Sequence, residues 1–409
     1  MYAGLVNFFN TTIAPGNQKH GYSKPVEQYR GLCALLVLIG HGTVDIHLLF
    51  NNFEWPEFVK YMNAGRLSVL IFFCISGYVI GITNDKLKLD VKSYLKKRLI
   101  RLYPTYLIAI ILCVIVAGSV SLYMLLGNVF FLQNDLYYYS FKIPIFINYP
   151  SWSLNYEALY YLLFIPVFFL RPKLWKMLLV MLALSVLLIH SNPYILFISN
   201  YITGFYFWML GLIIGWNIFK IRSESLQMPL LSLLFLHMCM HHLGIGQIIL
   251  HVVGIYSTTS INWLFDLPFC LMLMCVLTGK NNPFLKFNKL LTYAMPACVF
   301  LYLAVNHRLF EDIRWIMCLI YWGLSLALYF EKRISAILAD KLTFVGQISY
   351  GLYLLHVPVA GIIKKTVFIN DPVTEIIVKY TLWLTLTFAL SYVLEKRLQP
   401  AVKRYFSPA

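Results

Sequence analysis

Long apolar runs constrain this chain more than any other feature of its sequence. Stretches of about 17 to 25 mostly apolar residues, long enough to cross a bilayer as a helix, recur from Leu32 to Leu394 with short polar gaps between them. Hydrophobic residues make up 60% of the 409 residues, and charged residues only 12%. Because so little charge cannot cover the surface of a soluble protein, the composition excludes soluble enzyme folds.

The runs predict an all-α polytopic membrane protein, a bundle of about 10–12 transmembrane helices. We divide the chain into a segment at 1–29, a transmembrane domain at 30–397 and a tail at 398–409. The candidate spans lie at 32–50, 65–83, 102–126, 152–170, 174–190, 201–219, 229–255, 262–279, 290–305, 315–330, 348–369 and 376–394.

The basic residues predict the orientation of the bundle, because Lys and Arg are retained on the cytoplasmic side of a membrane. The chain has 33 Lys and Arg against 17 Asp and Glu, a formal charge of +16. With alternating spans most of these cations fall on one side, while loops 191–200 and 256–261 on the other side have none. We therefore expect both termini in the cytoplasm, contacts with membrane lipid and no nucleic-acid partner.

Burying an ionisable residue in a bilayer costs free energy, and such residues usually face an internal cavity. The first run contains several of them. Arg30 and His41 are eleven residues apart, so at about 100° per residue they share one helical face, with His41 roughly 16 Å further into the bilayer. Asp45 follows His41 by four residues and is close enough to fix the imidazole tautomer. The pattern predicts a general base, with a helix-packing histidine as the alternative.

A pair of arginines, Arg98 and Arg101, opens the third run from the cytoplasmic side. The planar fork of Arg binds two phosphate oxygens at once, and residues three apart share a helical face. The pair is therefore suited to the phosphates of a cytoplasmic donor. Anchoring to lipid headgroups explains the same spacing equally well.

Two further runs supply candidate acceptor-binding residues. Trp152 and Ser153 begin the fourth run, and Glu157 lies about 8 Å into it if the run is helical. A carboxylate at that depth needs a partner and suits hydroxyl binding or proton transfer, although a structural pairing between helices remains open. Tyr350 and His356 share a later run in which a proline frees backbone groups, as expected at an internal pocket.

Metal chemistry is poorly supported by the sequence. His237, His241, His242 and His251 are ligand types for zinc, but no acidic residue lies beside them and no third ligand is fixed. The eight cysteines lie in apolar runs, where thiols act as small hydrophobic groups, and they form no zinc-binding pattern. We expect no metal.

Several motifs occur in one order along the chain. They lie at 29–34 with His41, at 72–78, at 98–104, at 152–154 with Glu157, at 348–354 with His356, and at 395–397. Together they resemble the signatures of the membrane-bound acyltransferase 3 family, the O-acyltransferases that acetylate cell-surface glycans. The resemblance covers nearly the whole chain, from Arg30 to Arg397.

The resemblance implies an acyltransferase that moves an acyl group, with acetyl expected, from cytoplasmic acetyl-CoA to a hydroxyl of a surface polysaccharide or other glycan. It implies that Arg30 and His41 are the family's essential pair, with His41 as the base, and that Arg98 and Arg101 are its second arginine pair. It also implies the inner membrane of a bacterium as the location. Direct transfer and an acyl-histidine relay are both open, and the oligomeric state is not indicated.

Two other classes of function compete with this interpretation. A transporter or flippase for a polysaccharide or lipid-linked sugar would use a similar central cavity, but inverted repeats and paired broken helices are not visible in the sequence. A non-catalytic assembly partner would explain the apolar chain but not the pairing of His41 with Arg30. We therefore expect the acyltransferase.

Overall fold

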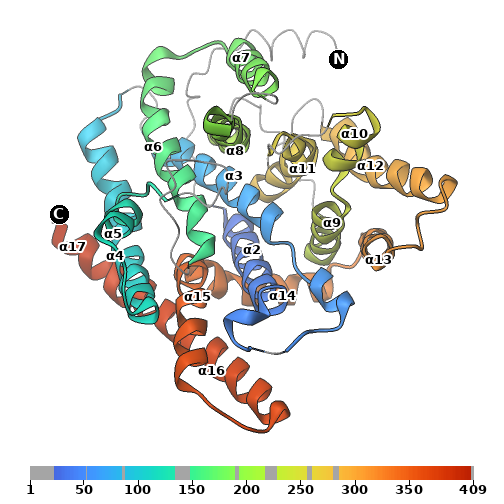
Figure 1. Ribbon diagram of the computed structural model, residues 1–409. Helices are drawn as coiled ribbons and strands as arrows, with labels where there is room; N and C mark the ends of the chain where they lie inside the picture. The colour runs from blue at the N-terminus through green and yellow to red at the C-terminus, as the bar shows by residue number, and fades with distance from the viewer. Residues whose placement is uncertain are drawn as a thin grey trace.

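The computed structural model describes residues 23–51, 53–84, 88–133, 148–188, 193–216, 228–255, 260–279 and 285–406. These residues form helices and contain no β-strand, so the predicted all-α class is confirmed for the described part of the chain. The helices surround α2, which runs through the middle of the molecule (Figure 1).

The helices follow the order of the predicted apolar runs, and each predicted span overlaps a helix. The longer helices are α2 (Lys24–Thr43), α3 (Gly65–Thr83), α4 (Val91–Ala117), α5 (Leu122–Val129), α6 (Trp152–Leu170), α7 (Leu174–Leu187), α8 (Pro193–Gly215), α9 (Leu230–Leu243), α10 (Ile245–Val252), α11 (Leu267–Thr278), α12 (Leu285–Val305), α13 (Ile313–Ala327), α14 (Arg333–Gln347), α15 (Ser349–Thr366), α16 (Pro372–Val393) and α17 (Gln399–Phe406). The short ones are η1 (Ile46–Leu48), η2 (Glu57–Tyr61), η3 (Tyr149–Ser151), η4 (Ser260–Asp266) and the π-helical η5 (Leu394–Leu398).

Eight helical stretches in the described residues are long and apolar enough to cross a membrane, which confirms a polytopic membrane protein. The pair α14 and α15, bent by 70° at their junction, makes a ninth if it is counted as one span. The predicted range of ten to twelve is higher because α7 and α13 are short and the first turns of α2 carry charged residues. The orientation of the termini stays a prediction.

Close contacts between glycines hold α3 against α8. Gly77 and Gly81 on α3 face Gly211 and Gly215 on α8, and an added Cβ at Gly77 would lie 1.9 Å from the carbonyl oxygen of Trp208. Small residues four apart let two membrane helices approach until their backbones touch, which maximises van der Waals packing where lipid gives no hydrophobic driving force. Helices α3 and α8 are therefore in direct backbone contact.

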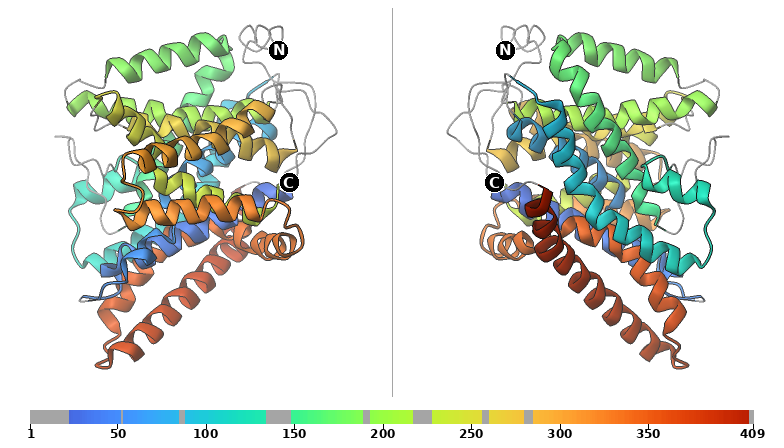
Figure 2. Two further views of the ribbon diagram at one scale, coloured as in Figure 1. Left: turned by 90° about the vertical axis from the view of Figure 1, so that its right-hand side faces the viewer. Right: turned by 90° about the vertical axis from the view of Figure 1, so that its left-hand side faces the viewer.

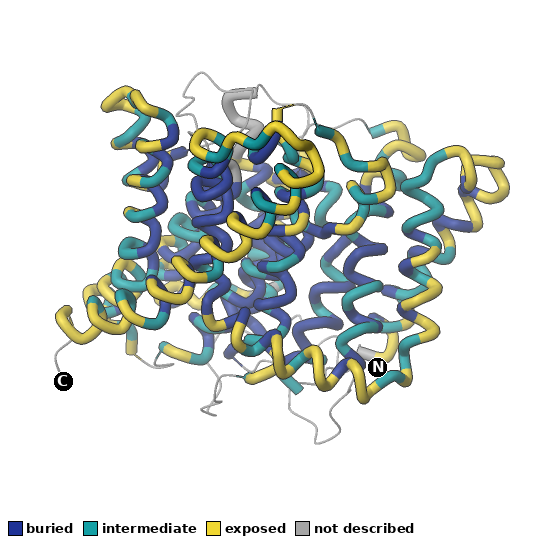
Figure 3. The backbone as a smooth tube through the Cα atoms, turned by 90° about the horizontal axis from the view of Figure 1, so that it is seen from below, coloured by how far each residue is buried: buried dark blue, intermediate teal, exposed yellow. Residues whose placement is uncertain are grey.

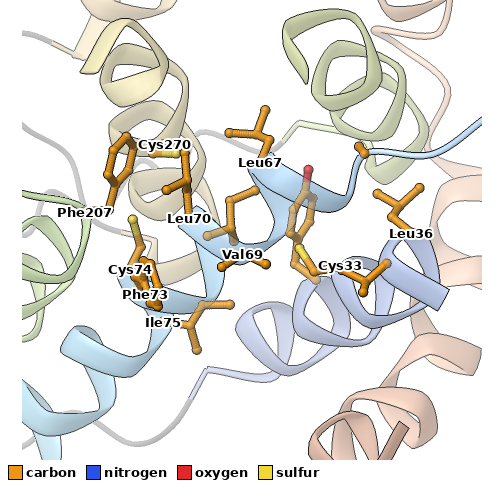
Figure 4. Close-up of a cluster of buried hydrophobic side chains, with 14 of the residues drawn as sticks. Cys33, Leu36, Leu67, Val69, Leu70, Phe73, Cys74, Ile75, Phe207 and Cys270 are labelled. Atoms are coloured by element: carbon orange, nitrogen blue, oxygen red, sulfur yellow. The ribbon is translucent and has the colours of Figure 1, made fainter. Parts of the chain in front are cut away.

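The core between these helices is apolar and rich in thiols. Figure 4 shows Cys33 of α2, Phe73 and Cys74 of α3, Phe207 of α8 and Cys270 of α11 gathered in one buried cluster. All eight cysteines are free, and seven of them are buried. They therefore act as packing groups, as their position in the apolar runs indicates.

Burial falls from the centre of the bundle to its edge. Buried residues concentrate on the central helices, whereas the outer helices expose one face along their length (Figure 3). The pair α15 and α16 projects from one side of the bundle (Figure 2), and only 22% of an 18-residue apolar window within Pro372–Phe406 is buried. Exposed apolar side chains on these outer faces are those expected to meet lipid.

A second close contact, between Gly31 and Gly346, positions α14 against α2 beside the candidate functional site. Gly31 of α2 lies against Gly346 of α14, so that an added Cβ at Gly31 would lie 2.5 Å from the carbonyl oxygen of Leu342. An added Cβ at Gly346 would lie 2.1 Å from the carbonyl oxygen of Glu27. Both obstacles are main-chain atoms, which cannot rotate away, and α14 is therefore fixed tightly against the start of α2.

We predict that Gly346→Ala destabilises the protein by about 1–3 kcal/mol, because the methyl group must push α14 away from α2. The measurement is thermal unfolding of the purified protein in detergent. Gly323→Ala on α13 is the matched control, since nothing lies within 4 Å of an added Cβ there. Equal melting temperatures for the two variants would contradict the prediction.

Candidate functional site

Helices α2 and α15 run side by side and present the predicted site residues at two levels. At the start of α2, Arg30 Nε donates to Ser349 Oγ at 2.8 Å, and its Nη2 donates to the carbonyl oxygen of Gly346 at 2.9 Å. Further along both helices, the rings of His41 and His356 lie with centroids 5.0 Å apart. Since both contacts follow chain order, the two helices are parallel.

The predicted contact between His41 and Asp45 is present. His41 Nδ1 and Asp45 Oδ2 are 2.6 Å apart, and Asp45 lies directly after α2, where the chain turns into η1. A carboxylate in this position accepts from Nδ1–H, which leaves Nε2 of a neutral imidazole unprotonated and able to accept a proton. The His41 side chain is 21% exposed, so this ring is not sealed within the bundle.

His356 differs from His41 because it is fully buried. Its Nδ1 lies 2.9 Å from the carbonyl oxygen of Leu352, one turn earlier in α15, and its own carbonyl accepts from Trp383 Nε1 at 2.7 Å. Its Nε2 has no hydrogen-bond partner among the described residues. A buried imidazole nitrogen without a partner is unusual, and here it lies beside the ring of His41.

A cavity of about 200 Å³ lies between α2, α3, α4, α6 and α15. Its polar side chains include a carboxylate held by two hydroxyls: Ser76 donates to Glu157 Oε1 at 2.7 Å and Tyr161 donates to it at 2.5 Å. The lining residues are Arg30, Val69, Phe72, Phe73, Ile75, Ser76, Val79, Arg98, Arg101, Leu102, Ser153, Leu154, Glu157, Tyr161, Ser349, Tyr350 and Tyr353. We call this space the inner cavity.

The two arginines of α4 are held in different ways. Arg101 forms an ion pair of 2.7 Å with Glu395 and lies over the ring of Tyr350, 4.8 Å from its centroid. Arg98 lies 5.7 Å from the ring centroids of both Tyr94 and Tyr161, and its Nε has no hydrogen-bond partner among the described residues. The charge of Arg101 is thus compensated by a carboxylate, whereas that of Arg98 rests on aromatic faces.

An open depression of about 520 Å³ leads to the inner cavity from the Arg30 end of α2. Arg30 and Arg101 line both spaces, so their guanidinium groups lie at the junction. The depression is lined by Lys24, Glu27, Arg30, Arg101, Thr343, Gln347, Glu395 and Lys396. We call this space the mouth; four of its eight lining side chains are cationic and two are acidic.

Nine of the ten predicted site residues fall into two groups. Six of them line the inner cavity: Arg30, Arg98, Arg101, Ser153, Glu157 and Tyr350. The other group, His41, Asp45 and His356, lies outside this cavity, beyond the ring of Tyr353. The residues predicted to bind the donor therefore share one space with Ser153, Glu157 and Tyr350, and the predicted base lies apart from that space.

Tyr353 forms the boundary between the two groups. Its hydroxyl bonds Ser153 Oγ at 2.7 Å and donates to the carbonyl oxygen of Pro150 at 2.6 Å, and its ring centroid lies 6.4 Å from that of His356. Trp152 does not line the inner cavity; its ring packs against Tyr156 with centroids 5.2 Å apart. Helical spacing could not place Tyr353, because its partners lie about two hundred residues away along the chain.

Glu395 is a second residue that sequence reasoning missed as a site residue. It pairs with Arg101, 294 residues earlier in the chain, and Thr105 also donates to it at 3.4 Å. The only signal in the sequence was its place in the closing motif at 395–397. Its charge sets how much of the positive potential of Arg101 remains for an anionic ligand.

The histidines considered for zinc lie elsewhere in the bundle. Tyr29 is hydrogen-bonded to His237 Nδ1 at 3.2 Å, and His242 Nε2 donates to the carbonyl oxygen of Asn63 at 2.6 Å. Within the described ranges no group of three His, Cys, Asp or Glu side chains is placed to hold a metal ion. These rings are held by hydrogen bonds to the protein.

Comparison with known proteins gives one match. The family model described as an acyltransferase domain, that of the acyltransferase 3 family, matches residues 26–396. No curated protein and no solved structure matches the chain. The matched residues include the inner cavity, the His41–Asp45 pair and every lining residue of the mouth except Lys24. Because the match covers most of the chain, this protein belongs to the acyltransferase 3 family and is a multi-pass membrane acyltransferase.

Proposed function

We propose that the protein is an O-acyltransferase that moves an acetyl group from cytoplasmic acetyl-CoA to a hydroxyl of a surface polysaccharide or other glycan in the inner membrane of a bacterium. The observation that carries the proposal is the position of Arg30 and His41 at the two ends of one helical face. Arg30 lines the mouth and the inner cavity, and His41 lies beyond them with its Nδ1 held by Asp45.

The mouth suits the nucleotide end of the donor. Lys24 and Lys396 bring positive charge to its rim, and Arg30 and Arg101 lie where it narrows into the inner cavity. Guanidinium and ammonium groups bind phosphate oxygens through charge-assisted hydrogen bonds. Arg98 lines the inner cavity one helical turn before Arg101 on α4, so the two guanidinium groups can together hold donor phosphates where the mouth narrows. The mostly apolar wall beyond them, which includes Val69 and Leu154, suits the thin arm that carries the thioester.

His41 is the proposed general base. Its Nε2 takes the proton of the acceptor hydroxyl as the oxygen attacks the thioester carbonyl carbon. The C–S bond then breaks, and the departing thiolate takes the proton from the imidazolium, which regenerates His41 and releases coenzyme A as the thiol. Asp45 stabilises the imidazolium during this exchange, and general-base help of this kind is typically worth about 10²–10⁴-fold.

The path between thioester and base requires one movement. Tyr353 separates the inner cavity from His356 and His41, so its ring must swing aside before the two reactants meet. Two hydrogen bonds of its hydroxyl, with Ser153 Oγ and with the carbonyl oxygen of Pro150, hold the ring in the closed position. Such a gate would keep water from the thioester until the acceptor is bound.

We predict that His41→Ala lowers acetyl transfer by about 10²-fold or more, because the acceptor hydroxyl loses its base. The measurement is the appearance of labelled acetyl from acetyl-CoA on glycan in purified membranes. His47→Ala is the matched control, since His47 is an exposed histidine in η1 that lines neither space. Unchanged transfer by the His41 variant would remove it from this role, and glycan export without labelling would favour a flippase.

We also predict that Arg98→Gln raises the KM for acetyl-CoA about tenfold, because a charge-assisted contact to a donor phosphate is lost. Acetyl-pantetheine, which lacks the nucleotide phosphates, should show a much smaller change. Lys97→Gln removes the same charge from an exposed neighbouring position and should leave both KM values close to wild type. An equal effect on both donors would contradict phosphate binding by Arg98.

A further inference from the structure

A second polar cavity lies apart from the mouth and the inner cavity, and the proposed mechanism does not use it. It encloses about 220 Å³ where α3, α9, α10, η4 and α13 meet. Its lining residues are Arg66, His241, His242, Gly244, Ile245, Gly246, Gln247, Asn262, Asp266 and Arg314. We call it the outer cavity; all but three of these residues carry polar side chains.

The charges of the outer cavity do not balance. Arg66 Nη1 forms an ion pair of 2.5 Å with Asp266, and its Nη2 donates to the carbonyl oxygen of His241 at 3.3 Å. Asp266 therefore neutralises Arg66. Arg314 is left as the second cation, and it forms no ion pair with any described residue.

The guanidinium of Arg314 is held through its Nε, whereas its two terminal nitrogens face the cavity without a protein partner among the described residues. Its Nε donates to the carbonyl oxygen of His242 at 2.6 Å. The group also lies over the ring of Trp315, 4.5 Å from its centroid. These contacts fix the direction of the fork and leave its two outer donors for a ligand.

Glycines make room for this arrangement. Gly244, at the break between α9 and α10, has a φ of +58°, and a Cβ there would lie 2.8 Å from Arg314 Nη2. A Cβ at Gly246 would lie 2.0 Å from the carbonyl oxygen of Asn262. The break in the predicted seventh span thus has a structural consequence, because it creates a cavity that a regular helix would fill.

The outer cavity lies toward the His41 end of α2. His242 Nε2 donates to the carbonyl oxygen of Asn63 at 2.6 Å, and the side chain of Asn63 lies 3.3 Å from the position of a Cβ on Gly40. Gly40 directly precedes His41 in α2. The cavity is therefore near the proposed base and at the opposite end of α2 from the arginine that lines the mouth.

We propose that the outer cavity binds an anionic group of the acceptor, a carboxylate or phosphate carried by the glycan, with Arg314 as its main ligand. Arg314 supplies a forked pair of donors, and the amide groups of Gln247 and Asn262 line the wall beside it. The proposal rests on the proposed function, since it names the substrate class of that reaction. The contacts from His242 through Asn63 to Gly40 place this cavity at the same end of α2 as His41.

The test is binding of small anionic sugars to the purified protein in lipid nanodiscs, measured by calorimetry. The probes are a glucuronate-containing disaccharide, glucose 1-phosphate and a neutral glucose disaccharide. We expect one or both anions to bind and the neutral sugar not to bind, with affinity falling as salt is raised. Tighter binding of the glucuronate disaccharide indicates an acceptor that carries a carboxylate, and tighter binding of glucose 1-phosphate indicates one that carries a phosphate.

Arg314→Gln should weaken anion binding about tenfold or more, because two charge-assisted donors are lost. Arg308→Gln is the matched control, since Arg308 is exposed in the loop before α13 and does not line the cavity. Arg314→Lys keeps the charge without the fork and should recover part of the affinity. If Arg314→Gln lowers the melting temperature strongly, the affinity of the Arg314→Lys variant tests the role of the fork in its place.

Equal anion affinity in wild type and Arg314→Gln, or equal binding of the neutral sugar, would overturn the proposal. Failure of wild type to bind either anion would overturn it as well. Anion binding that depends on Arg314 in a protein without acetyl transfer would uphold the cavity and overturn the proposed function instead. The two proposals therefore fail in different measurements.

Discussion

The close approach of α2 and α14 at Gly31 and Gly346 is the constraint on which the candidate site depends. Main-chain atoms occupy the space that any side chain at either position would need, so the two helices touch along their backbones. The 70° bend after α14 then turns α15 to run beside α2. This single geometry brings Arg30 to Ser349 and His41 to His356.

Charge compensation differs among the arginines that line the cavities. Arg66 and Arg101 are each paired with a carboxylate, as expected where an uncompensated charge in a low-dielectric interior is costly. Arg98 and Arg314 form no ion pair with any described residue, and each lines a cavity. Two cations with spare hydrogen-bonding capacity at opposite ends of the site agree with an anionic donor on one side and an anionic acceptor on the other.

Local spacing predicted the parts of the site that lie within one turn or one face of a helix. The contact of His41 with Asp45 is of this kind, because residues four apart meet on a helix whatever surrounds them. The partners of Tyr353 and Glu395 were not predictable in this way. Their contacts join segments two to three hundred residues apart, and no pattern within a single sequence predicts which helices become neighbours.

The sequence by itself determined that this protein folds in a membrane and which ionisable residues are available to form its site. Apolar runs of bilayer length require helices, since only helices satisfy the backbone internally in lipid, and ionisable residues within those runs are few enough to name. The tertiary structure decided which of them share a space. It placed Tyr353 between His356 and the inner cavity and formed the outer cavity around Arg314, because helix packing depends on side-chain shape across distant segments.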